Sequence, residues 1–386
     1  MIKRALLGLL GLVALAIAYL LAWPVAIAPV AWDPPEDRGY TGAFASNTAL
    51  AALERLELGL EPSKAGPEDI AARDGRLYAS SASGRILTLD PVTGEVRVFA
   101  DTGGLPLGME FDAEGNLLVA DAARGLLRIG PDGGIELLTD SVNGTPIPFA
   151  DDVDIGPDGV VYFSDASTKF GAVETGSPTE ASLHEIMEHA RTGRLLAFDP
   201  ASGATTVVAD GLAFPNGVAI TADGEAVLVN ITGEYNTLRI PVAGGRRTGE
   251  ITEFAANYPG FPDNINPGPP LRGEATYIVG LVSPRSADLD RLAARPALRK
   301  MVWRLPEALR PAAADYTHIV ILGEDGRVLR SLQDPSGAYA QATGGIVMGG
   351  DLYLSSLTET AIARLPLADT LTPDTSTPDM SKETLP

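Results

Sequence analysis

Five positions recur at one phase of a repeating pattern in this sequence, each just before a short apolar run. The last of them is taken together with the residue that follows it, which makes six side chains. Five of the six carry an oxygen, and the set is Glu68, Leu107, Asp151, Asn216, Asp263 and Asn264. Carboxylate and amide oxygens without His or Cys are typical ligands of a hard cation. Ca²⁺ fits better than Mg²⁺, because calcium accepts many protein oxygens in loose geometry. The sequence therefore predicts a calcium site if the fold brings these positions together.

Taken singly, each of these residues has a simpler explanation as a turn residue or a strand cap. Gaps of 39, 44, 65 and 47 residues separate the first five positions, so only the repeat makes them recognisable as a set. Three carboxylates brought together would repel one another and raise each other's pKa values. A divalent cation among them would remove that repulsion, which supports the metal interpretation.

Short antiparallel strands are the elements that must position these residues. The clearest unit is 105–134, in which near-alternating apolar runs flank the turns 112–115 and 131–133. Such a unit cannot bury both faces alone, and further copies begin near Gly66, Phe149, Phe214, Gly260 and Gly345. Radial repetition with a period of roughly 40 to 50 residues predicts an all-β fold, a six-bladed β-propeller. A β-sandwich is the alternative.

Equivalent positions in the inner strands of a propeller meet near its central channel. An N-terminal strand commonly completes the last blade, and we expect residues 55–60 to do so. Insertions at 168–191 and 283–313 interrupt blades three and five, and helix-like spacing occurs in 181–190 and 288–304. Both should roof the face where the inner strands begin, either as caps of the sheet edges or as a substrate lid or membrane contact.

An apolar run near the N-terminus predicts a single-pass membrane anchor. Residues 5–23 contain no charge and are long enough to span a bilayer as a helix. Lys3 and Arg4 precede the run, so the positive-inside rule puts the N-terminus in the cytoplasm and the propeller on the periplasmic or extracellular side. A cleaved signal peptide is the alternative, although its candidate site at 26–28 is followed by Pro29.

Composition and charge narrow the function classes. The chain has no Cys, which excludes disulfides, a thiol nucleophile and a Cys-ligated metal. Its net charge of −21 argues against nucleic acid and anionic membrane surfaces as electrostatic partners and suits a body that holds a cation. We expect a cytoplasmic stub, signal-anchor helix and linker over 1–31, the propeller over 32–368, and a disordered tail over 369–386.

Several motifs occur in a specific order along the chain. They are Leu105–Gly108, Leu118–Asp121, Phe149–Asp154, Val161–Asp165, Gly193–Leu196, Phe214–Gly217, Pro259–Ile265, Arg295–Lys300 and Leu332–Gly337. In these motifs the chain resembles the strictosidine synthase-like family, above all its membrane-anchored branch, over about residues 48–368. The resemblance implies a six-bladed propeller related to paraoxonases and to SMP-30/gluconolactonase-like proteins. Those relatives bind a catalytic Ca²⁺ at the channel centre and hydrolyse lactones and aryl esters.

The resemblance also implies which residues bind calcium and which mechanisms are absent. Its ligands would be Glu68, Asn216, Asp263 and Asn264, with Asp151 where relatives usually have Asn. Plant strictosidine synthases use a Glu before the central strand of the last blade, but residues 342–350 read ATGGIVMGG. Paraoxonases use a His in the second blade, where this chain has Leu107. Neither strictosidine condensation nor His-assisted water attack is therefore expected.

Hydrolysis of an ester or lactone remains the leading functional hypothesis. Ca²⁺ would polarise the carbonyl, while Asp263 or Asp151 takes a proton from water. The alternative is a non-catalytic propeller that keeps calcium for stability and binds a ligand or a protein partner. Of the three His, His318 lies in an apparent strand and is expected to be structural, whereas His184 and His189 lie on the first insertion and could reach the channel.

Overall fold

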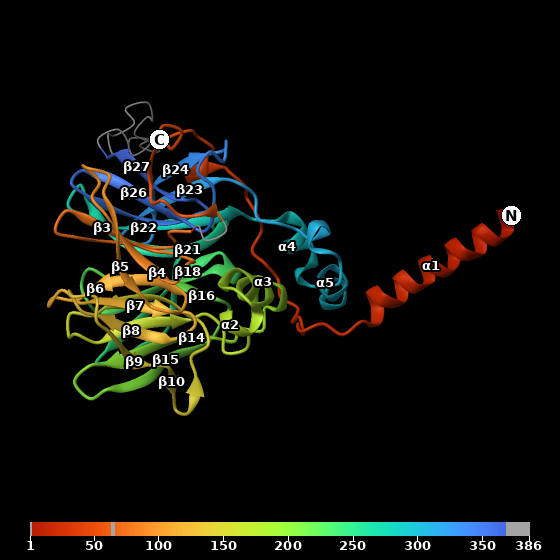
Figure 1. The fold of residues 1–386 in the computed structure, drawn as a ribbon, viewed down its shortest axis with the longest axis horizontal. Coiled ribbons are helices and arrows are strands. Elements are labelled where there is room, and N and C mark those ends of the chain that lie inside the picture. Colours follow the sequence, from red (N-terminus) through yellow and green to blue (C-terminus); the bar gives the residue numbers. More distant parts are fainter. Residues whose placement is uncertain (1, 63–65, 368–386) are drawn as a thin grey trace, which may run out of the picture.

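The structure, a computed structural model, describes residues 2–62 and 66–367, and these form a six-bladed β-propeller (Figure 1). Blades one and two comprise β2 (Ile70–Arg73), β3 (Arg76–Ser80), β4 (Arg85–Leu89), β5 (Val96–Asp101), β6 (Pro106–Phe111), β7 (Leu117–Asp121), β8 (Gly125–Ile129) and β9 (Ile135–Thr139). Blades three and four comprise β12 (Ala150–Ile155), β13 (Val161–Asp165), β14 (Gly193–Asp199), β15 (Ala204–Leu212), β16 (Pro215–Ile220), β17 (Ala226–Ile231), β18 (Asn236–Ala243) and β20 (Thr252–Ala255). Blade five comprises β21 (Gly260–Leu271), β22 (Glu274–Pro284), β23 (Thr317–Gly323) and β24 (Val328–Asp334).

The last blade closes the ring with a strand from the other end of the chain. It comprises β25 (Ala342–Met348), β26 (Asp351–Ser356), β27 (Ala361–Pro366) and β1 (Glu54–Glu57), with Glu54 opposite Arg364 and Glu57 opposite Ala361. The predicted closing strand at 55–60 is thus confirmed, although it begins one residue earlier and ends at Glu57. The inner strands of successive blades pack against one another, and β25 also contacts β2, so the ring is complete.

Apolar side chains between neighbouring blades form the core. Leu195 of β14 packs in one cluster with Val227 and Val229 of β17, for example, and all three are fully buried. A twisted sheet that is apolar on both faces needs a neighbour on each side, which the ring supplies. Near the axis, the blades approach so closely that a Cβ on Gly108 would overlap Asp152, and one on Gly217 would overlap the backbone of Asp263. Any larger residue at these two positions would force the inner strands apart.

Both insertions lie where the repeat predicts, on the face where the inner strands begin. The first, between β13 and β14, contains α2 (Ala172–Thr175) and α3 (Pro178–Glu188), and α3 starts with Ser177 accepting a hydrogen bond from the Glu180 amide. The second, between β22 and β23, contains α4 (Ala287–Ala293) and α5 (Pro296–Trp303). The helix-like spacing over 288–304 is therefore two helices, because Pro296 cannot continue a helix and starts a new one instead.

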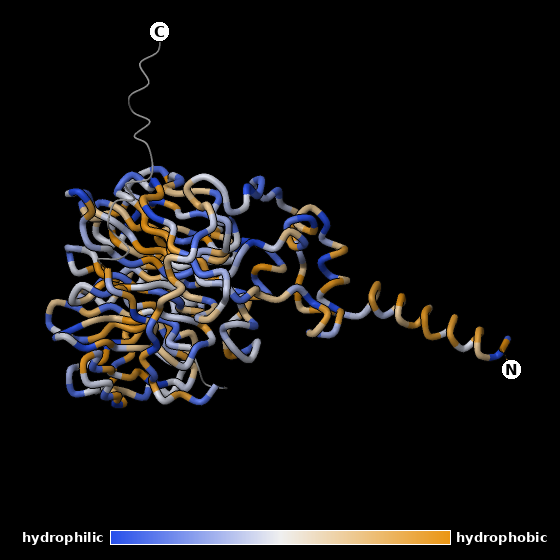
Figure 2. The backbone as a smooth tube through the Cα atoms, turned by 90° about the horizontal axis from the view of Figure 1, so that it is seen from above, coloured by the Kyte–Doolittle hydropathy of each residue, from blue (hydrophilic) through white to orange (hydrophobic). Residues whose placement is uncertain are grey.

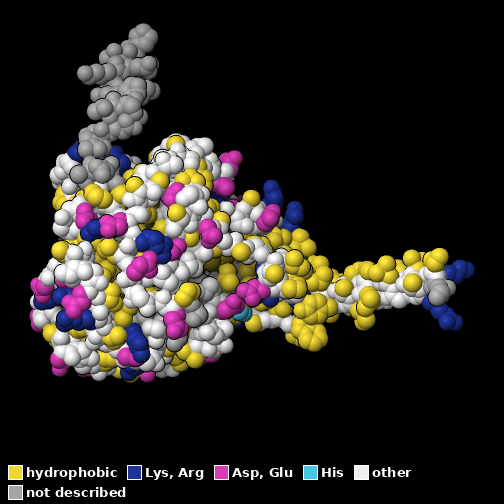
Figure 3. All heavy atoms as spheres, turned by 45° about the horizontal axis from the view of Figure 1, so that its top comes forward, with side chains coloured by type: hydrophobic (Ala, Val, Ile, Leu, Met, Phe, Trp, Pro, Cys, Tyr) yellow, Lys and Arg dark blue, Asp and Glu magenta, His cyan; other side chains and the backbone are white. Residues whose placement is uncertain are grey.

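Helix α1 (Ile2–Ala22) projects from the roofed side of the propeller (Figures 1 and 2). It is long and apolar enough to cross a membrane, with a mean hydropathy of 2.6 over its best window, and none of that window is buried in protein. Hydrophobic side chains cover it and continue onto the adjoining part of the roof (Figure 3). The predicted tail over 369–386 lies outside the described residues.

The linker after α1 runs between the two insertions. The Val30 amide donates to the carbonyl of Glu188 at 2.8 Å, and the Trp32 amide donates to the carbonyl of Ala293 at 3.3 Å. The Trp32 ring stacks on His189, with 4.1 Å between the ring centres. We call this segment, residues 24–35, the strap, because it joins the α3 side of the roof to the α4 side.

Candidate functional site

A two-residue irregularity in the inner strands positions the predicted site residues. In blades two to six the pairing of the inner strand shifts across two residues: between Pro106 and Met109, Ala150 and Val153, Pro215 and Val218, Pro262 and Ile265, and Ala342 and Gly345. The first skipped residue is Leu107, Asp151, Asn216, Asp263 or Thr343, and Glu68 holds the matching place ahead of β2. Such bulges aim a side chain out of the regular ladder. Here they aim one side chain per blade toward the channel mouth.

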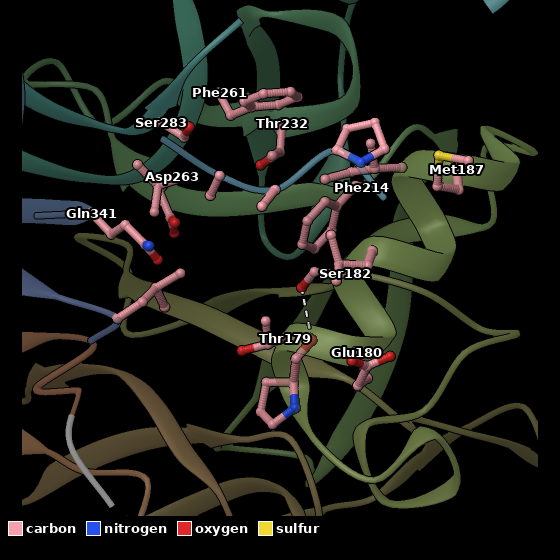
Figure 4. A pocket seen from close by; sticks show the side chains of 18 of the residues that line it. Thr179, Glu180, Ser182, Met187, Phe214, Thr232, Phe261, Asp263, Ser283 and Gln341 are labelled. Carbon is pink, nitrogen blue, oxygen red and sulfur yellow. Dashed lines mark hydrogen bonds between the residues drawn. The ribbon is translucent and has the colours of Figure 1, made fainter. Parts of the chain in front are cut away.

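Five of these six first positions border one cavity of about 470 Å³ beneath the roof. Glu68, Leu107, Asp151, Asn216 and Asp263 line its inner end. Its wall is largely apolar and includes Phe149, Met187, Phe214, Phe261, Val302 and Trp303. Figure 4 shows Asp263 and Gln341 on one side of this space and the α3 residues Thr179 and Ser182 on the other. The cavity therefore joins a polar floor to an apolar roof.

Glu68 is held by hydrogen bonds from blades five and six, one to its side chain and two to its carbonyl. Asn264 donates from Nδ2 to Glu68 Oε1 at 3.1 Å and to the Glu68 carbonyl at 3.0 Å. Thr343 donates from Oγ1 to the same carbonyl at 2.6 Å. Asn264 occupies the second skipped position of blade five, not the phase of the other candidates, and it does not line the cavity. Asn264 therefore orients the Glu68 carboxylate through Nδ2, and its Oδ1 is left without a hydrogen-bond partner.

Four buried oxygens among the predicted residues have no hydrogen-bond partner. They are Glu68 Oε2, Asp151 Oδ2, Asn216 Oδ1 and Asn264 Oδ1. A buried polar atom without a partner costs roughly 1–3 kcal/mol, so a set of four in one place indicates an absent ligand. Two carboxylate and two amide oxygens form a donor set of the kind that Ca²⁺ takes. The residues thus fit a calcium ion.

That fit depends on the amide oxygens as much as on the acids. Among residues 2–62 and 66–367, no three His, Cys, Asp or Glu side chains form a metal-binding cluster by themselves. The carboxylates still interact strongly: burial, then Asp263 and Asp151, raises the pKa of Glu68 well above its usual range. Burial raises the pKa of Asp263 to about 7, against a hydrogen bond from Asn216 that lowers it. A cation would relieve this repulsion.

Three contributors to the channel were not predicted from the sequence. Thr343 supplies the first position of blade six, where only the absence of an acid had been noted. Asp69 and Asp152 hold second positions and point into the channel wall, where Asp69 Oδ2 accepts from the Met109 amide at 2.8 Å and Asp152 Oδ2 from the Val218 amide at 2.7 Å. Aligning the residue after each candidate would have revealed both acids.

None of the three His lines the cavity. His318 Nε2 lies 2.9 Å from Ser331 Oγ in a buried aromatic cluster, which agrees with a structural role. His184 Nδ1 lies 2.7 Å from the carbonyl of Glu180, and its ring contacts Phe170 and Trp303. His189 is buried against Trp32. The first insertion therefore brings no imidazole to the carboxylates.

Comparison with known proteins places these residues in a family. A family model for strictosidine synthase matches residues 151–241, and one for the N-terminal part of strictosidine synthase-like proteins matches 42–89. Adipocyte plasma membrane-associated protein from Danio rerio is 31% identical over 378 residues, covering 92% of this chain and 87% of the relative. The human protein of that name is 32% identical over 351 residues, covering 84% and 80%. The chain belongs to the strictosidine synthase-like family.

Membership agrees with the expectation from the motifs, and α1 together with these plasma membrane-associated relatives suggests a membrane anchor. Solved structures bear out the fold. A gluconolactonase from Xanthomonas campestris superposes with a TM-score of 0.58 at 19% identity, covering 88% of this chain and 97% of the other. A calcium-binding regucalcin from Agrobacterium tumefaciens superposes with a TM-score of 0.56 at 14% identity, covering 81% and 93%. At these identities the likeness concerns the fold alone.

Proposed function

We propose that this chain is a calcium-dependent hydrolase of esters or lactones, with the metal on the floor of the roofed cavity. The observation that carries the proposal is the set of four orphan oxygens, because three of the four belong to residues that line the cavity. A floor that can hold a cation beneath a largely apolar wall suits a substrate with one reactive carbonyl and an apolar body. Structural neighbours named gluconolactonase and calcium-binding regucalcin support it as analogy.

The ligands of the ion would be Glu68, Asp151, Asn216, Asp263 and Asn264. A bound Ca²⁺ supplies a Lewis acid for the carbonyl oxygen. Asp263, or alternatively Asp151, accepts a proton from a water molecule whose oxygen bonds to the carbonyl carbon. The bond from that carbon to the ester oxygen then breaks, and the proton passes to the leaving oxygen. An ester yields an acid and an alcohol, and a lactone yields one hydroxy acid.

The roof and the anchor complete the proposal. Phe214, Met187 and Trp303 exclude bulk water from the carbonyl and hold the apolar part of the substrate. Lys3 and Arg4, in the first turn of α1 and ahead of its uncharged run, favour a cytoplasmic N-terminus, with the propeller on the periplasmic or extracellular side. Calcium is more abundant there than in the cytoplasm, which suits a site of moderate affinity.

A panel of aryl esters and lactones, offered to the detergent-solubilised full chain, tests the proposal. We expect turnover with calcium and its loss in chelator, with recovery when calcium is restored. Absence of turnover on every member, together with a large fall in melting temperature in chelator, would instead establish a calcium-stabilised propeller that binds a ligand without acting on it.

A further inference from the structure

The end of α1 is attached to the roof of the cavity. Arg304, directly after α5, donates from Nε to the carbonyl of Trp23 at 2.6 Å and from Nη1 to the carbonyl of Leu20 at 2.7 Å. The last carbonyls of a helix have no partner within the helix, and a cation there also favours the helix dipole. Arg304 therefore ties the apolar helix to α5 at the point where the helix ends.

The same part of the roof forms the outer end of the cavity. Val302 and Trp303 of α5 line it together with Leu183, Ile186 and Met187 of α3. Apolar side chains extend from this lining to the surface, since Leu183 is 37% exposed and Leu298 of α5 is 39% exposed. Figure 3 shows hydrophobic side chains gathered on this part of the surface, next to α1. An apolar path thus runs from the surface beside α1 to the cavity.

The charge of this region is opposite to that of the whole protein. Residues 295–310 contain five Lys or Arg and one Glu, 5 − 1 = +4, in a chain whose net charge is −21. Arg299 and Arg304 are buried, so the cations of this segment that reach the surface are Arg295, Lys300 and Arg310. A basic, amphipathic helix is typical of a segment that lies on a membrane with anionic lipids. Arg310 covers the Trp303 ring at 4.6 Å from its centre, so a cation lies at the outer edge of the cavity wall. Such long cationic side chains place their charge at the lipid headgroups.

We propose that the cavity takes its substrate directly from the bilayer that holds α1, and that the substrate is an ester or lactone with a single acyl chain. The acyl chain of the substrate enters between α3 and α5 and lies against Trp303, while the substrate carbonyl reaches the carboxylate floor. A cavity of about 470 Å³ suits one ligand of ordinary size. The chemical step rests on the proposed hydrolase function, but the capture from the membrane rests on α1, α5 and the cavity alone.

Tryptophan fluorescence separates capture from hydrolysis, because Trp23, Trp32 and Trp303 are the only tryptophans in the chain. The double variant Trp23→Phe, Trp32→Phe leaves Trp303 alone to report on the cavity. This variant is reconstituted at full length into vesicles that contain some anionic lipid. The probe is the methyl ester of dibromostearic acid, whose bromines quench a tryptophan in contact with its acyl chain. We expect saturable quenching when the probe is in the protein's own vesicles.

A matched pair of substitutions places the path between the roof helices. In the single-tryptophan background, Leu183→Asp puts a charge into the cavity lining. It should raise the mole fraction of brominated ester in the lipid that quenches half of the Trp303 fluorescence by about tenfold or more. Val173→Asp, on the same insertion at a position that is 60% exposed and does not line the cavity, should change it by less than about twofold. Melting curves establish that both variants are folded.

Three outcomes would overturn the inference: quenching that does not saturate, quenching equally affected by the two substitutions, or quenching as fast from separate vesicles as from the protein's own. The last would mean that the ester travels through water. Calcium-dependent hydrolysis of short aryl esters with no quenching of Trp303 would leave the hydrolase proposal standing and remove this one. Saturable quenching without turnover of any ester would leave capture from the membrane standing and remove the hydrolase proposal.

Discussion

The floor and the roof of the cavity are built in different ways. The floor is set by backbone, since the inner strands of blades two to six skip two residues at the same place and Glu68 holds the matching position ahead of the inner strand of blade one. The roof is set by side chains that bond to distant backbone, as Arg299 does with the carbonyls of Val30 at 2.9 Å and Ile186 at 2.8 Å. A feature built by the repeat can be predicted from the repeating pattern in the sequence. A feature built by single long-range hydrogen bonds leaves no such pattern and cannot be predicted in this way. The proposed chemistry depends on the first kind of feature and the proposed access route on the second.

The largest effect should follow from a change on the floor. Glu68→Gln keeps the shape of the side chain but removes a charged ligand, and we expect turnover to fall by about 10²-fold or more, with weaker calcium binding. Hydrolysis and calcium titration are measured on the same preparation. The matched control is Glu180→Gln, a carboxylate at the α3 end of the same cavity, which should stay within a few-fold of wild type. Equal losses of turnover in Glu68→Gln and Glu180→Gln would contradict the assignment of the chemistry to the floor of the cavity alone.

A roof variant should loosen access while leaving the floor intact. Arg299 is 1% exposed, and Arg299→Met removes its hydrogen bonds to two partly buried carbonyls, at a cost of roughly 1–3 kcal/mol in total. We expect faster amide exchange in the strap, α3 and α5, with the inner strands unchanged. Arg291→Met serves as control, because Arg291 pairs only with the exposed Asp288 at 3.0 Å and should shift stability by less than about 0.5 kcal/mol. Exchange that rises throughout the propeller would contradict a separately held roof.

The sequence predicted the floor better than the roof. Strand order, the closing strand, both insertions and the meeting of Glu68, Asp151, Asn216 and Asp263 all follow from a repeat whose phase is visible in one chain. The strap was expected only as a linker, because nothing local marks Val30 as a partner of a residue 269 positions away. The contact of Arg304 with the end of α1 was hidden for the same reason. Long-range contacts to backbone leave no periodic trace.

The smallest effect concerns a histidine outside both regions. Burial lowers the pKa of His318 to about 3, from 6.5 in an unfolded chain. A lowered pKa in the folded state means that its contribution to stability is complete above about 6.5 and is lost as the pH falls toward 3, by up to about 1.4 kcal/mol per unit. His318→Phe should therefore flatten the fall of the free energy of unfolding between pH 6.5 and 4, as measured by denaturant titration. A variant with the wild-type slope would show that His318 is not the group responsible.

Calcium titration of the full chain by calorimetry, after exhaustive chelation, tests the central claim most directly. The four orphan oxygens predict at least one ion per chain, a rise in melting temperature on binding, and a clear loss of affinity in Asp151→Ala and Asn264→Ala. Wild-type protein that binds no calcium, and whose melting temperature does not respond to it, would contradict the proposed metal centre and the hydrolase function that depends on it.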